Sequence, residues 1–332
     1  MKRSSNQFDL YALIPFLFLC AAVTLRTVAC FVNLNYDTGY FGEKVLITIA
    51  SCFAGAAIFL TVARVFADKE RIPAPKSPTA GSYITAGALA VALLFHALEL
   101  LGDYKDRIPT VKMPADQIFE LVCPVLALLA IFALFLEIYY EKRDTSVKAF
   151  FGIATSLFFA SFAAYVYFKR DFPINAPNKI TEEMAFLFAA VYFIYETRIS
   201  LGRSIWRLHA TFGLIAFEVA AYNSIPALIL YPIKGECITD SITSALVIFL
   251  VAVFALVRVL IFSTSAKDEK CTSAETVDAI FAERLGNIKG EFAIAREDNN
   301  VENHTENPDN YEIQLPESEP APTEEKNEDS DK

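Results

Sequence analysis

Ionisable and polar residues interrupt several long apolar stretches of the sequence, and these are the residues that could do chemistry. His96 and Glu99 are three positions apart and Glu218 and Tyr222 are four apart, so on helices each pair shares one face. An ionisable group at membrane depth is costly and usually finds a partner or faces water. These positions are therefore candidates for a binding site or for buried ion pairs.

Two sets of such groups emerge when the apolar stretches are aligned. The first set, in the outer halves of the predicted spans, gives the ligand-binding or ion-pair candidates: Arg26, His96, Glu99, Glu120, Glu218, Tyr222 and Asn223. These residues could line a polar cavity for a cation or a small polar ligand. Alternatively, an internal salt bridge such as Arg26 with Glu218 or Glu99 would only fix the packing. The second set lies near the inner ends, and its two acids and two bases favour structural ion pairs: Arg64, Glu137, Glu196 and Arg258.

The sequence offers little for a cofactor, a metal or a catalytic centre. His96 and His209 are predicted at different depths, so they would not ligate one haem. A mixed set of His96, Glu99, Glu120 and Cys123 is loosely spaced for a metal, and we expect neither a metal nor a cofactor. The sequence contains no P-loop, G-x-G-x-x-G, H-E-x-x-H, G-x-S-x-G or EF-hand pattern. The protein is therefore predicted not to be an enzyme.

Long apolar stretches must position the polar groups. A membrane-crossing helix needs about 20 mostly apolar residues. Eight stretches qualify: 10–32, 45–66, 83–102, 117–140, 148–168, 181–201, 205–231 and 239–262. The sixth is the weakest, because its uncharged run extends only from Met184 to Tyr195. Each odd stretch leads through a short polar loop into an even one, which predicts four helical hairpins.

The composition divides the chain into two regions of different charge. Residues 1–266 carry a net charge of +2, whereas residues 267–332 hold 19 acidic and 7 basic residues. The hydrophobic fraction of 54% and the mean hydropathy of +0.37 are typical of an integral membrane protein. They exclude collagen-like, disulfide-scaffold and wholly disordered chains. The predicted fold class is an all-α integral membrane protein with about eight transmembrane helices.

Three regions are predicted along the chain. A polytopic membrane domain spans 1–264, a cytoplasmic segment spans 265–296 with an amphipathic helix near 273–287, and a disordered acidic tail spans 297–332. Glu, Asp, Asn and Pro dominate the tail, which is too poor in apolar residues to form a core. Its charge would repel nucleic acid, so the predicted partners are the lipid bilayer and a basic protein that docks on the tail.

The distribution of Lys and Arg predicts the orientation. With the N-terminus inside, the inner segments carry 15 basic residues and the outer loops carry 8, so both termini are predicted to be cytoplasmic. The predicted location is the cell membrane, in the style of small multi-pass bacterial proteins. Cys30 and Cys237 are both predicted near the outer face, where a disulfide could form.

Two functional hypotheses follow from these observations. The leading one is a non-enzymatic membrane protein with a sensing, regulatory or assembly role, in which the acidic tail engages a partner. The alternative is a small-solute or ion transporter that uses an outer-half polar cavity around four of the candidates: Glu218, Glu99, His96 and Arg26.

Overall fold

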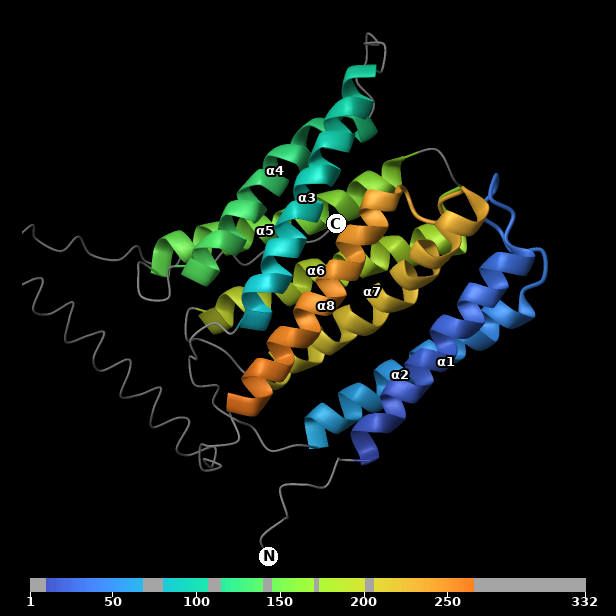
Figure 1. The fold of residues 1–332 in the computed structure, drawn as a ribbon, viewed down its shortest axis with the longest axis horizontal. Coiled ribbons are helices and arrows are strands. Elements are labelled where there is room, and N and C mark those ends of the chain that lie inside the picture. Colours follow the sequence, from blue (N-terminus) through green and yellow to red (C-terminus); the bar gives the residue numbers. More distant parts are fainter. Residues whose placement is uncertain are drawn as a thin grey trace, which may run out of the picture. The chain divides into compact units, whose positions relative to one another are not determined.

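The described part of the chain is helical almost throughout (Figure 1). The computed structural model describes residues 10–67, 80–106, 115–139, 145–169, 173–200 and 206–265. Its helices are α1 (Leu10–Asn33), α2 (Val45–Ala67), α3 (Ala80–Asp106), α4 (Ala115–Tyr139), α5 (Thr145–Phe168), α6 (Pro177–Ser200), α7 (Trp206–Lys234) and α8 (Ile242–Ser265). The chain divides into two units, 1–273 and 274–332, and all eight helices belong to the first. The predicted amphipathic helix and acidic tail lie outside the described residues.

Seven of the eight described helices are long and apolar enough to cross a membrane, and α6 is the exception. Five charged residues lower the hydropathy of α6: Lys179, Glu182, Glu183, Glu196 and Arg198. However, Glu182 is only 2% exposed and Glu196 only 1%. The low hydropathy of α6 therefore comes largely from charges that face other helices. The described chain thus has the predicted all-helical membrane character, with seven apolar helices in place of the eight expected spans.

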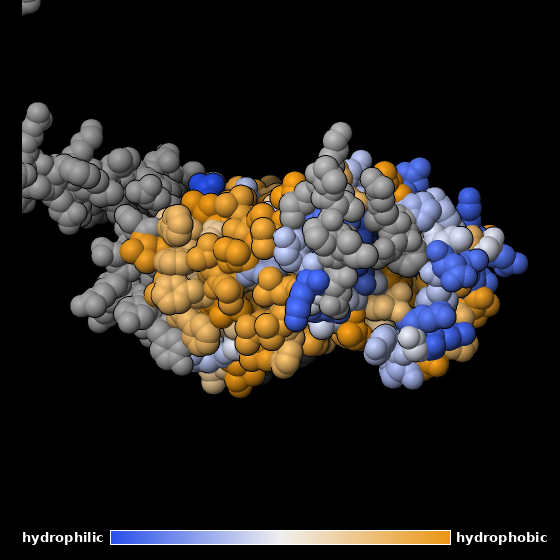
Figure 2. Space-filling view, turned by 90° about the horizontal axis from the view of Figure 1, so that it is seen from above, coloured by the Kyte–Doolittle hydropathy of each residue, from blue (hydrophilic) through white to orange (hydrophobic). Residues whose placement is uncertain are grey.

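Large apolar side chains cover the outside of the helical unit. Phe59 and Ile84 are each 71% exposed, and many other Phe, Leu, Ile and Val side chains are more than one-third exposed. Figure 2 shows a broad hydrophobic area over the face in view, with hydrophilic residues gathered toward one end. An exposed apolar area of this kind suits contact with lipid rather than with water.

Six of the described helices pack as a ring. Each helix from α3 to α8 contacts the next one along the chain, and α8 returns to contact α3. Helices α1 and α2 pack on each other and on α7 (Figure 1). Helix α7 therefore contacts its neighbours in the ring on one side and the α1–α2 pair on the other. This explains why buried residues extend along most of its length.

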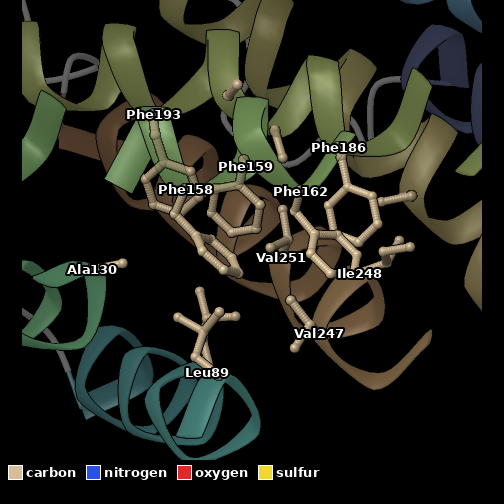
Figure 3. Packing of buried hydrophobic residues seen from close by; sticks show 14 of the residues in the cluster. Leu89, Ala130, Phe158, Phe159, Phe162, Phe186, Phe193, Val247, Ile248 and Val251 are labelled. Atoms are coloured by element: carbon tan, nitrogen blue, oxygen red, sulfur yellow. The ribbon is translucent and has the colours of Figure 1, made fainter. Parts of the chain in front are cut away.

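The centre of the ring is built from phenylalanine. Phe159 of α5 stacks on Phe193 of α6 with ring centroids 5.1 Å apart, and Phe162 meets Phe186 edge-on at 4.5 Å. Figure 3 shows these rings beside apolar side chains of α3, α4 and α8: Leu89, Ala130, Val247, Ile248 and Val251. Lipid is as apolar as these side chains, so close van der Waals contact, rather than removal from water, stabilises helix pairs of this kind.

Gly213 allows α7 to approach its neighbours closely. A Cβ atom at this position would lie 2.5 Å from Cγ2 of Val259 on α8 and 3.2 Å from Cε2 of Tyr192 on α6. A Cβ at Gly55 of α2 would have nothing within 4 Å.

We expect Gly213→Ala to lower the melting temperature of the detergent-purified protein by several degrees, because overpacking costs about 1–3 kcal/mol. The matched control Gly55→Ala should leave it unchanged or raise it, since Ala favours helix by up to about 1 kcal/mol. Equal melting temperatures for the two variants would show that the contact at Gly213 is not tight.

Candidate functional site

A cavity of about 320 Å³ lies between α1, α2, α7 and α8. Apolar side chains form most of its wall, and Trp206, the single tryptophan of the chain, is among them. The polar residues of the wall are few: Thr61, Arg64, Glu218 and Ser263. A largely apolar cavity with a few convergent polar groups is the usual form of a small-molecule site.

Glu218 is the central polar group of this cavity. Its side chain is buried, at 5% exposure, and Oε1 accepts a hydrogen bond of 2.5 Å from the Thr61 hydroxyl. Oε2 is also buried, and no described residue donates a hydrogen bond to it. Because an unsatisfied buried acceptor costs free energy, this oxygen is the natural point for a ligand to donate a hydrogen bond.

Arg64 brings the opposite charge to the same wall. It lies three residues after Thr61, so both side chains share one face of α2. Glu218 belongs to the outer set and Arg64 to the inner set of the candidates, and the cavity wall contains one residue from each. The other outer-set candidates do not line this cavity.

Arg26 does not form the salt bridge considered from the sequence. Its Nη2 atom donates to Oδ1 of Asn178 at 3.2 Å and to Oδ1 of Asn223 at 3.1 Å. Its guanidinium also lies 4.4 Å from the centroid of the Tyr222 ring. Glu218 lies five residues before Asn223, about 7.5 Å along α7 and about 140° around it, and therefore faces elsewhere.

His96 and Glu99 lie together at the contact between α3 and α8. Nδ1 of His96 is 3.6 Å from Oε2 of Glu99, and both groups contact the Thr243 hydroxyl. The Ser241 hydroxyl donates to the same Glu99 oxygen at 2.9 Å. Glu120, on α4, is fully buried outside the cavity wall. The seven outer candidates are therefore divided among separate places in the bundle.

Glu182 of α6 is a buried acid that the sequence candidates did not include. The Ser244 hydroxyl donates to its Oε1 at 2.5 Å, and the backbone N–H of Asp240 donates to its Oε2 at 2.9 Å. Lys169 in turn forms a 2.5 Å ion pair with Asp240. This network joins the start of α6 to the start of α8. Sequence spacing gives no signal for it, because its members come from three distant segments.

Only two of the four inner-set residues are shown in contact with each other. Arg258 of α8 forms an ion pair with Glu196 of α6, and its Nε donates at 2.6 Å. His209 also reaches Glu196, with Nε2 2.6 Å from Oε2, and the Tyr192 hydroxyl donates to the same oxygen at 2.9 Å. Arg64 lines the cavity instead, and the side chain of Glu137 lies outside those described. His209 was considered from the sequence only as a haem ligand.

No group of three or more metal-ligating side chains gathers anywhere in the described segments, and His96, Glu99, Glu120 and Cys123 form no such site. Cys30 and Cys237 are both free thiols, so the disulfide considered from the sequence is absent. Burial raises the pKa of the Cys237 thiol, which lies in the loop before α8 and is consequently a poor nucleophile.

Comparisons with known protein families, with curated proteins and with solved structures find no match for this chain. Function must therefore be inferred from its own residues.

We expect Glu196→Gln to destabilise the protein by about 3–5 kcal/mol, because the substitution removes the buried anion that Arg258 and the buried His209 share. Thermal unfolding in detergent would measure the loss. Glu183→Gln removes a less buried carboxylate from the same helix and should cost much less. Similar losses in the two variants would contradict a special role for the buried ion pair.

Proposed function

We propose that this protein binds a small amphipathic ligand in the cavity at Glu218 and acts as a sensing or regulatory membrane protein rather than as an enzyme. The observation that carries the proposal is that Oε2 of Glu218 accepts no hydrogen bond from a described residue, although it lies on the wall of a largely apolar cavity. A polar group at such a place fixes the orientation of a ligand, while the apolar wall supplies contact area.

The ligand class follows from the wall. An apolar body suits the side chains of α1, α7 and α8, and an ammonium or hydroxyl group would donate to Glu218. The cavity, at about 320 Å³, is near the lower end of small-molecule sites, which run from about 300 to 1,000 Å³. The ligand is therefore a compact molecule with one donor group.

Binding alone explains the groups present. No histidine or cysteine lines the cavity, and the hydroxyl of Thr61 already donates to Glu218. The competing function is transport, in which Glu218 would also carry a proton. Of the four residues of the transport site that the sequence predicts, only Glu218 lines this cavity, because Glu99, His96 and Arg26 lie elsewhere.

Trp206 provides a direct assay because it lies on the cavity wall. Octylamine that carries a terminal bromine should quench its fluorescence saturably in the detergent-purified protein. The matching alcohol should bind comparably, and the matching carboxylate more weakly, because a carboxylate has no hydrogen to donate to Oε2 of Glu218. Glu218→Gln should weaken amine binding about tenfold or more, since a hydrogen bond to a charged group is worth about 1.5–3 kcal/mol.

The control is Glu183→Gln, which removes a carboxylate outside the cavity and should leave the quenching curve unchanged. Equal quenching by all three head groups, with no effect of Glu218→Gln, would indicate partitioning into the micelle and contradict the proposed site. Transport adds one result: proton flux in proteoliposomes above that of empty liposomes, abolished by Glu218→Gln. Proton flux no higher than that of empty liposomes would contradict transport and favour the sensing role.

We also propose that α6 crosses the membrane as the sixth of eight spans, in four helical hairpins. A helix of 24 residues is about 36 Å long, and its most buried charges face the protein. In a cysteine-free background, Asn175→Cys and Arg198→Cys should react with a membrane-impermeant maleimide from opposite sides of sealed vesicles. Labelling of both from the same side would contradict the crossing.

A further inference from the structure

Arg26 is a buried cation without a buried anion beside it. Its side chain is only 1% exposed, in the interior of an apolar helical unit. No carboxylate of the described segments forms an ion pair with it, and its hydrogen-bond acceptors are the neutral amides of Asn178 and Asn223. An uncompensated charge at such depth costs several kcal/mol unless another ion neutralises it.

Two N–H donors at this place have no acceptor among the described residues: Nε of Arg26 and Nδ2 of Asn223. Each is two covalent bonds from the Arg26 Nη2 to Asn223 Oδ1 hydrogen bond, so both lie close to that hydrogen bond. The orientation of the amide is fixed chemically. A guanidinium only donates, so Asn223 must offer it the oxygen, and the amide nitrogen remains available.

The surrounding residues hold Arg26 in place. The Tyr222 ring lies 4.4 Å from the guanidinium, and the Tyr222 hydroxyl is 3.2 Å from the Ser51 hydroxyl of α2. Asn178 comes from the first turn of α6, and Asn223 from α7. Four helices therefore fix a buried cation and its free donors before any ion binds. Preorganisation of this kind favours binding, because little freedom remains to be lost.

We propose that a small monovalent anion of the chloride class binds at Nε of Arg26 and Nδ2 of Asn223. One positive charge matches one negative charge, and a site with two donor nitrogens suits a halide better than a large oxyanion. The bound anion neutralises Arg26 and stabilises the contacts of α1 with α6 and α7. This site is separate from the cavity at Glu218, whose wall does not include Arg26.

The test measures thermal unfolding of the detergent-purified full chain at constant ionic strength. Replacing gluconate stepwise by chloride or bromide should raise the melting temperature saturably by several degrees, because an ion that binds only the folded state stabilises it. Arg26→Gln should abolish the shift. Arg198→Gln, which removes an exposed arginine of α6, should retain it. Equal melting temperatures of the wild type in gluconate and chloride would overturn the proposal.

Asn223→Asp keeps the proposal testable if Arg26→Gln does not fold. The new carboxylate supplies Arg26 with an internal counter-charge and removes the Nδ2 donor. This variant should melt in gluconate at least as high as the wild type does in chloride, and it should show no response to chloride. A full chloride response in Asn223→Asp would overturn the site.

Cys30→Ser tests another side chain that interacts with the guanidinium, the thiol one turn further along α1. The wild-type chloride shift should persist in this variant, and its loss would show that anion binding depends on the thiol rather than on the two nitrogen donors. Chloride should also leave Trp206 fluorescence unchanged, which separates this test from that of the cavity.

Discussion

The cost of leaving a charge unpaired in an apolar bundle is the constraint on which this structure depends. Helix α6 avoids this cost near both of its ends through contacts with α8. Glu182 contacts Ser244 and Glu196 contacts Arg258, and the two partners are 62 residues apart in each case. A constant separation means that α6 and α8 run parallel and in register over 14 residues, about 21 Å of helix. Buried polar contacts thus fix the register of two helices that apolar packing alone would leave less specific.

The contact between the α1–α2 pair and α7 is of a different kind. Arg26 is held there by amides and an aromatic ring, and Glu218 by one hydroxyl, so neither has a protein counter-ion among the described residues. Each also keeps one buried atom without a hydrogen-bond partner. The α6–α8 contact is paired internally, whereas this one has capacity for ligands. That difference is why both proposed sites lie along α7 on the side of α1 and α2.

The positions of the helices could be predicted from the sequence far better than the partners of the charged groups. Apolar runs placed all eight described helices within a few residues, because hydropathy and length determine where a span can lie. The partner of Arg26 could not be predicted in this way. The sequence placed Arg26 and Glu218 in the same set, but Asn223 faces Arg26, whereas Glu218 lies about 7.5 Å away along α7 and about 140° around it. The contact of His209 with Glu196 could not be predicted either, because 13 residues and a helix connection separate the two along the chain.

Helix α6 shows how buried charges lower the average hydropathy of a helix whose exposed side chains are largely apolar. The scale counts Glu182 and Glu196 as unfavourable, although they are among the most buried side chains of the helix. The exposed positions along the middle of α6 are apolar, as Met184, Leu187 and Ile194 show. A helix that carries polar contacts on its inner face therefore has a low average hydropathy, because the residues that form those contacts are themselves polar. The two buried carboxylates of α6 therefore explain why the sixth predicted span is the weakest of the eight in the sequence.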